Sequence, residues 1–420
     1  MPSELQRLID DLVTQMKSGS APAYRTAMKR LADAARAGGP ESLTAAVEAL
    51  APLLPGLSGD FAMTAVLAGA CVEWVRPPWL SSDVLPRRAS EAMMLNEVVQ
   101  EFWDEAARGR SLPEPVSAST HQLVRTLTGL ARWHRDVDKN TMTRIAMSWF
   151  DMEHWLKALI TVMADAGFRA AVAGDVKAEL REHSAAVAHR SQRAAWVGAL
   201  AAVLDDEPLV VIDLRTHRGY ALTMSGVGDN GQLHILLADR LVGDPGQGLV
   251  AGDRPARSWV EAATSGDPHL GSDDPAIRCF RLFDGQGAYI SPEGVPAYIG
   301  PLDGTRVLVL HPPNGNYALG VGRVFEHMMP ALRLDRILEP AETQRWLAQL
   351  APAVENDLMA DWRLPHPLVP HAPRMRLARP LRPEATWVGV LPWAGVPLTC
   401  ADYPLTFAVV RCCSSALSRS

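Results

Sequence analysis

The spacing of apolar residues changes at Glu207-Pro208, and this change constrains the fold more than any other feature of the sequence. Before it, apolar side chains recur every three or four positions, which is the repeat of an amphipathic helix. After it come short β-rich runs separated by turns that contain Gly and Asp. We therefore predict an α+β protein, with a helical region over 1–205 and an α+β domain over 206–351.

The first region contains a series of helical stripes that are separated by Gly-, Pro- and Ser-containing breaks. Helices joined by short loops are typical of an irregular bundle or stack. No repeat of fixed period is present, so a regular solenoid is not favoured. The predicted helices cover residues 3–18, 22–37, 41–53, 60–75, 87–107, 119–134, 140–166 and 175–204.

The second region begins with a predicted β-hairpin formed by 209–214 and 220–224. Because the strands follow one another in hairpin order with helices inserted, we predict a mixed, largely antiparallel sheet and not a doubly wound parallel one. Pro340 fits the first turn of a helix, where a proline is tolerated. The other predicted strands are 276–283, 287–290, 305–310 and 332–338, and the predicted helices are 232–241, 255–263 and 341–350.

The composition changes again near residue 361. Nine prolines fall between Pro365 and Pro404, four arginines cluster nearby, and the end of the chain is rich in serine. Such a composition is poorly suited to a packed core. We therefore predict a weakly ordered Pro/Arg-rich tail over 352–420.

The whole-chain composition narrows the functional classes. A net charge of −6 argues against a protein that coats nucleic acid or an anionic membrane with its whole surface. No run of about 18 apolar residues and no secretory signal is present, so neither a membrane span nor export is expected. The five cysteines have no metal-ligand spacing, which fits reduced thiols in a cytosol. We predict a cytoplasmic protein without a cofactor.

The strongest constellation for catalysis is Asp229 and His234 with His311. An aspartate on a loop, a histidine on the following helix and a second histidine at a strand end are suited to general acid–base chemistry of a hydrolase type. The alternative is that Asp229 or Asn230 caps the helix and His234 packs beneath it, which needs no substrate.

Three further sequence patterns are weaker candidates for a functional site. Asp151 and His154 share a helical face, as metal ligands do, but only one such unit is present. Residues 226–231 contain G-x-G-x-x-G between a strand and a helix, yet the preceding strands read as a hairpin and not as a parallel nucleotide-binding unit. The arginines of 120–145 suggest a DNA-binding face, but the tight turn of a helix-turn-helix is missing.

Two stretches, Gly226-Val-Gly-Asp-Asn-Gly-Gln-Leu-His-Ile-Leu-Leu-Ala-Asp-Arg-Leu-Val242 and Leu302-Asp-Gly-Thr-Arg-Val-Leu-Val-Leu-His-Pro-Pro313, resemble an uncharacterised protein family of GC-rich, actinobacterial-type genomes. The resemblance covers roughly 207–350. It implies a regulatory or accessory role beside genes for antibiotic resistance or secondary metabolism, and it supplies no chemical activity.

Since each catalytic pattern has a structural alternative, we predict a non-catalytic intracellular regulatory or accessory protein. Its expected partner is another protein, bound through the helical region. The rival hypotheses are a small-molecule hydrolase that uses Asp229, His234 and His311, and a DNA-binding transcriptional regulator, for which nucleic acid would be the partner. An enzyme needs these side chains to converge in a pocket, whereas a binding protein needs an exposed apolar patch.

Overall fold

The computed structural model describes residues 4–18, 20–57, 62–73, 82–107, 112, 125–126, 128–129, 139–265, 276–277, 279–292, 294–313, 318–319, 323, 325 and 327–354. Most of the predicted helix 119–134 and nearly all of the predicted tail lie outside these residues. The described chain divides into two compact units. The helical unit comprises the residues up to 161 together with 186–194, and the sheet unit comprises 162–185 and the residues from 195 on.

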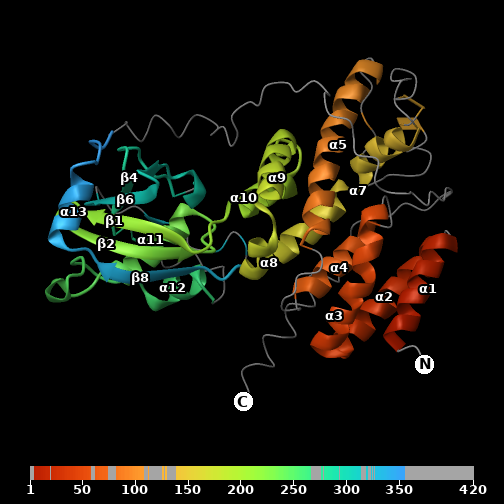
Figure 1. Cartoon of the computed structure of the whole chain (residues 1–420), viewed down its shortest axis with the longest axis horizontal. Helices are drawn as coiled ribbons and strands as arrows, with labels where there is room; N and C mark the ends of the chain where they lie inside the picture. The colour runs from red at the N-terminus through yellow and green to blue at the C-terminus, as the bar shows by residue number, and fades with distance from the viewer. Residues whose placement is uncertain are drawn as a thin grey trace. The chain divides into compact units, whose positions relative to one another are not determined.

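The helical unit consists of helices in the places that the apolar periodicity predicts (Figure 1). Its core includes Leu12, Leu31 and Leu50, which are fully buried. None of the described helices is long and apolar enough to cross a membrane. The elements are α1 (Glu4–Ser18), α2 (Ala21–Ala37), α3 (Gly39–Leu50), the 3-10 turn η1 (Ala51–Gly56), α4 (Met63–Glu73), α5 (Val84–Ala107) and α7 (Lys139–Met163), and the boundary between the units falls near the end of α7.

Two contacts explain how these helices pack closely. Tyr24 on α2 and Thr64 on α4 share a buried hydrogen bond between their hydroxyl groups, 2.5 Å long. Gly69 on α4 lies against Ala158 on α7, where a Cβ atom would come within 2.9 Å of the Ala158 carbonyl oxygen. A side chain at Gly69 would therefore force α4 and α7 apart.

The predicted helix 175–204 is two helices, α9 (Gly174–Val187) and α10 (Gln192–Ala202). Ser191 ends the first run and caps the second, because its Oγ accepts the Ala194 N–H at 3.1 Å. The short helix α8 (Ala166–Ala171) precedes them and is capped by Asp165, which accepts the Phe168 N–H. The prediction of one long helix was wrong at this capping serine.

The sheet unit is built around a sheet with the strand order β4-β6-β1-β2-β8, with β5 also paired to β6 (Figure 1). The predicted hairpin is present, with β1 and β2 paired antiparallel. Strand β6 lies parallel to β1, and the other pairs are antiparallel, so the prediction of a mixed, largely antiparallel sheet is confirmed. The strands are β1 (Glu207–Asp213), β2 (Arg218–Ser225), β4 (Arg281–Asp284), β5 (Pro301–Leu302), β6 (Thr305–His311) and β8 (Ala331–Ile337), and a separate pair is formed by β3 (Ala276–Ile277) and β7 (Ala318–Leu319).

The predicted strand 287–290 is wrong. Its only ladder contact among the described residues is an isolated bridge between Phe283 and Tyr289. The Asp284 carboxylate accepts the N–H groups of Gln286 and Ala288, and these bonds hold the backbone in a tight turn. The segment therefore returns along β4 without becoming a strand.

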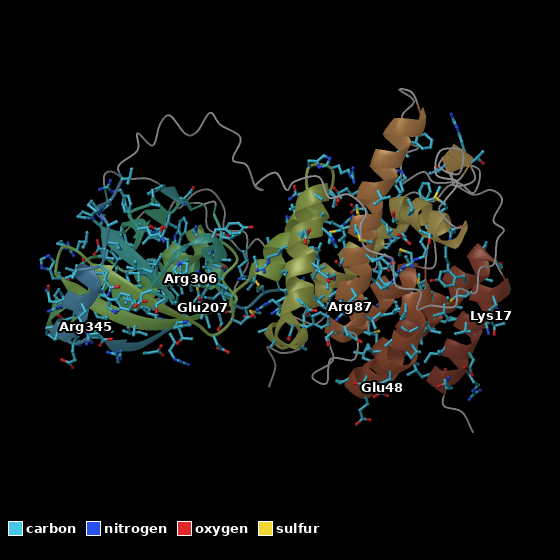
Figure 2. The ribbon with its side chains drawn as sticks, turned by 45° about the horizontal axis from the view of Figure 1, so that its top comes forward. Lys17, Glu48, Arg87, Glu207, Arg306 and Arg345 are labelled. Carbon is cyan, nitrogen blue, oxygen red and sulfur yellow. The ribbon has the colours of Figure 1, made fainter. Side chains whose placement is uncertain are left out.

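Helices cover both faces of this sheet. Helices α11 (Asn230–Leu241) and α12 (Arg257–Ala263) pack on one another, and α11 packs on the face that carries Leu209, Leu222 and Leu308. Helix α13 (Pro340–Leu347) packs on β1 and β2 from the other face, against Val210 and Ile212. Glu207, the first residue of β1, forms an ion pair with Arg306, the second residue of β6, with Nε and Oε1 3.1 Å apart (Figure 2).

Candidate functional site

The predicted site begins at Asp229, which is the N-cap of α11. Its backbone is extended, and its Oδ1 accepts the Gln232 N–H at 2.7 Å. In return, the Gln232 side chain reaches back and accepts the Gly228 N–H through Oε1 at 2.7 Å. These reciprocal bonds form a variant of the capping box, and they account for Asp229 by local structure.

The next two amides of α11 are also used within the protein. The N–H of Asn230 donates to the carbonyl oxygen of Gly294, and the N–H of Gly231 donates to that of Pro292, both at 2.9 Å. A phosphate bound at a glycine-rich loop needs free amides at the helix N-terminus. Because these amides already have acceptors, and because the preceding strand is antiparallel to its neighbour, loop 226–231 does not have the arrangement of a nucleotide-binding loop.

The buried amide side chains near this helix end pair with backbone groups. Gln232, which is 4 % exposed, donates through Nε2 to the Ala263 carbonyl oxygen at the end of α12, 2.7 Å away. Asn230, equally buried, donates through Nδ2 to the Ser291 carbonyl oxygen at 2.9 Å. Both side chains therefore join α11 to the loops around it.

His234 lies on α11 inside the core of the sheet unit. Its side chain is 3 % exposed, and its Nε2 accepts the Cys279 N–H at 3.1 Å. Its ring packs against Phe280, with 5.0 Å between centroids. The accepted hydrogen bond assigns the unprotonated nitrogen to Nε2, so the lone pair that a general base needs is already engaged.

His311 lies at the end of β6, half-buried, with its ring 4.5 Å from that of Phe283. Side chains alternate between the faces of a strand. Leu310 belongs to the core beneath α11, so His311 points to the opposite face. The structure therefore does not bring His234 and His311 together, and it places the sheet between them.

A second polar cluster lies between helices α5 and α7 of the helical unit. Arg88 and Arg144 each form an ion pair with Glu91, and the guanidinium of Arg88 stacks on Trp155 at 4.8 Å from the ring centroid. Asp151, 3 % exposed, completes the cluster. The cavity between them measures about 10 Å³, which is room for no more than one water molecule.

The metal hypothesis for Asp151 and His154 gains no support from this arrangement. Among the described residues, no three His, Cys, Asp or Glu side chains come close enough to hold a metal ion. Asp151 lies beside Arg88, whose positive charge already compensates the carboxylate. Burial, together with Lys157 and Arg193, lowers the pKa of His154 to about 4.

The proposed DNA-binding face is described only in part. Arg125 is exposed, whereas Arg144 is mostly buried in its ion pair with Glu91. Arg132 and Arg135 lie outside the described residues. Arg144 is therefore not available to a phosphate backbone, and the continuous basic face that this hypothesis requires is interrupted there.

One open surface feature that the sequence did not reveal is a groove along the outer edge of β8. It has a volume of about 500 Å³ and lies between β8 and α11. Five consecutive residues, 330–334, line it together with Leu236, Arg240 and Thr264. The strand itself was predicted, but a sequence pattern does not say which strand ends a sheet.

Exposed apolar side chains gather in the same unit. The large apolar residues that remain exposed among those described are Trp196, Tyr298, Met329, Ile337 and Val354, and all belong to the sheet unit. Met329 lies two residues before β8 and is 62 % exposed, and Ile337 is the last residue of the strand. The two ends of the β8 edge are therefore apolar.

No protein-family model matches the sequence, and neither a curated protein nor a solved structure is similar to it.

Proposed function

We propose that this protein is a non-catalytic regulatory or accessory protein that acts by binding protein at the β8 edge of its sheet. The observation that carries the proposal is the groove along β8, because four consecutive residues of this edge strand, 331–334, line it together with the preceding Pro330. An edge strand offers unpaired backbone donors and acceptors, and an extended segment of another chain can pair with them.

The chemistry of the groove supports protein as the ligand. Leu236, Leu332 and Leu334 provide an apolar floor, and the exposed arginines Arg240 and Arg333 lie at its rim. Main-chain pairing gives affinity in such a site, and alternate side chains that enter an apolar floor give specificity. This proposal moves the partner surface from the helical region, where it was expected, to the sheet unit.

The hydrogen bonds of the predicted catalytic residues favour a binding role over a hydrolase. Asp229 is used as a helix cap, and the Nε2 of His234 accepts a backbone N–H. The family resemblance implies a role beside genes for antibiotic resistance or secondary metabolism. We therefore propose that the bound protein takes part in one of these processes.

The test is site-specific photo-cross-linking in the native cell. A photoreactive residue at Ala331, which is exposed in the groove, is compared with one at Arg345, which is exposed on α13 at the other face of the sheet (Figure 2). We expect one discrete protein adduct from position 331 and none of that mass from position 345. A Leu334→Lys substitution, which places a charge in the groove, should abolish the adduct. Equal labelling from both positions, or no adduct from position 331, would contradict the proposal.

A further inference from the structure

We infer that the strand that occupies the β8 groove is β8 of a second copy of this chain, paired antiparallel about Leu334. The inference rests on the proposed role of the β8 edge and names its partner. Two copies related by a twofold axis would then form one sheet that continues across the interface.

The charges of β8 are complementary to themselves in this register. In an antiparallel pair centred on Leu334, the residue before the centre faces the residue after it. Arg333 of one copy therefore faces Asp335 of the other, and the twofold axis repeats the contact. Opposite charges in directly opposed positions stabilise a strand pair, whereas like charges destabilise it.

The neighbouring registers lack this complementarity. A pair centred on Arg333 would place two Arg333 side chains opposite each other, and a pair centred on Asp335 would do the same with two carboxylates. Like charges at the centre of a pair are unfavourable. The sequence of β8 therefore selects the register centred on Leu334 among those close to the middle of the strand.

The structure already holds the two charges on one face of the edge. Arg333 Nε donates to Asp335 Oδ1 at 2.6 Å, and the Thr223 hydroxyl donates to Asp335 Oδ2 at 2.6 Å. The Arg333 side chain is 73 % exposed and that of Asp335 is 32 % exposed, so both remain accessible to a second copy. Dimerisation would turn two ion pairs into an alternating set of four charges without burying any of them deeply.

The apolar part of the groove fits the same partner. Leu334 is half-buried on the face beneath α11, where Leu236 and Leu332 form the floor of the groove. At the centre of the pair, Leu334 of each copy meets its equivalent over this floor. The apolar floor and the charged pair thus lie on opposite faces of one edge, and a copy of the same strand satisfies both.

A bulge limits the length of the pairing. The register between β2 and β8 shifts between Ala221 and Leu222, which leaves Asp335 as the extra residue of β8. A bulge twists the strand beyond it, so only the residues close to Leu334 can pair in register. We therefore expect a small interface and a dissociation constant in the micromolar range.

The test is the mass of the full chain by sedimentation equilibrium from about 1 to 100 µM, the range in which a micromolar dimer forms. Arg333→Asp alone and Asp335→Arg alone each place like charges in opposed positions, and each should raise the dissociation constant at least about tenfold. The double variant Arg333→Asp/Asp335→Arg restores opposite charges and should dimerise as the native chain does.

Mixing the two single variants gives the most specific test, because each variant supplies the charge that the other lacks. Two variants that fail to self-associate should form a mixed dimer with each other. The matched control is Arg345→Asp, which makes the same charge change on the exposed face of α13 and should leave the dimer unchanged. Thermal unfolding of each variant establishes that it is folded.

A native chain that stays monomeric to 100 µM, or a dimer that is insensitive to both charge reversals, would overturn the inference. Either result is distinct from failure of the proposed function. If the Ala331 cross-linker still captures a different protein while the purified chain is monomeric, the edge binds protein but not a second copy. If the Ala331 adduct has twice the mass of the chain, both proposals are supported.

Discussion

Two buried polar clusters, one in each unit, are satisfied in different ways. In the helical unit, Arg88, Glu91 and Arg144 pair mainly with one another, while Arg88 also reaches the Leu57 carbonyl oxygen. In the sheet unit, Gln232 and other buried polar side chains such as His234 pair with backbone groups of loops. Helices satisfy most of their own backbone, so the charged side chains of this cluster between α5 and α7 pair mainly with each other. Loops leave donors and acceptors that buried side chains must satisfy.

This difference predicts which buried polar groups can be replaced by apolar ones. A paired charge between helices can be exchanged for a well-packed apolar pair with little loss. A side chain that hydrogen-bonds two backbone groups cannot be replaced by an apolar one in this way. The two backbone groups would remain buried without a hydrogen-bond partner. The following experiments test that distinction.

The largest effect is expected for Glu91→Ala. This change removes the carboxylate that both Arg88 and Arg144 contact, and it should lower the stability of α5 and α7 by about 3 kcal/mol because two guanidinium groups lose their partner. The measurement is hydrogen exchange of the α5 and α7 amides. The paired variant Glu91→Met/Arg144→Met should recover to within about 1 kcal/mol of the native value. A paired variant as unstable as the single one would remove the distinction between the units.

Gln232→Met is expected to cost about 2–3 kcal/mol, because it leaves the Gly228 N–H and the Ala263 carbonyl oxygen buried without their partner. The side chains are similar in length, so the loss reports hydrogen bonding and not volume. Hydrogen exchange of the α11 amides measures it. In contrast to the Glu91 pair, no apolar residue at position 232 should restore stability, and a Met variant within about 0.5 kcal/mol of the native protein would contradict this account.

The helical unit should also lose stability on acidification because of His154. Burial first, and then Lys157 and Arg193, lower its pKa in the folded state to about 4 from the ordinary 6.5. Below pH 6.5 the unfolded chain binds a proton that the folded chain does not, so stability falls as the pH falls from 6.5 to 4. The loss between pH 7 and pH 5 should be at most about 2 kcal/mol.

His154→Phe provides the control for this pH dependence. It should flatten the pH profile of α7 exchange over that interval while leaving the profile above pH 7 unchanged. If the native and variant profiles remain parallel down to pH 4, His154 is not the source of the acid sensitivity.

The smallest effect is expected at the α11 cap. Asp229→Ala should cost about 1 kcal/mol, because the Gln232 N–H loses its acceptor. Asp229→Asn keeps an acceptor oxygen and should stay within about 0.5 kcal/mol of the native protein. Thermal unfolding of the sheet unit distinguishes the two. Equal losses for Ala and Asn would point to a need for the negative charge and not for the cap.

Local patterns in the sequence predicted the local structure. The hairpin of β1 and β2, helix α11 and the start of α13 at Pro340 each depend on residues close together in the chain, and each is present. Two local signals were misread. Ser191 was an available capping signal inside an apparently continuous helix, and the turn-forming Asp284 was available before the false strand at 287–290.

Arrangement over long distances could not be predicted in the same way. Nothing in the sequence of β6 indicates that it pairs parallel to β1, and nothing in β8 indicates that it ends the sheet. The candidate site failed to converge for the same reason. Asp229 and His234 are near each other in the chain, and the alternative of a helix cap and a packed histidine follows from their local sequence. The distance of His311 from them depends on the face of the sheet to which it points, which the local sequence does not determine.

The parallel pairing of β1 and β6 has a consequence for how the chain folds during synthesis. The hairpin of β1 and β2 can form within microseconds once both strands exist, but the residue paired with Leu209 is Arg306, roughly a hundred positions later. A ribosome adds about 5–20 residues per second, so this interval lasts roughly 5–20 s. Until β6 emerges, the edge of β1 that faces away from β2 has no strand paired with it. Newly made chains are therefore prone to mispairing and aggregation at this edge of β1, and at the opposite edge of the hairpin on β2 until β8 emerges.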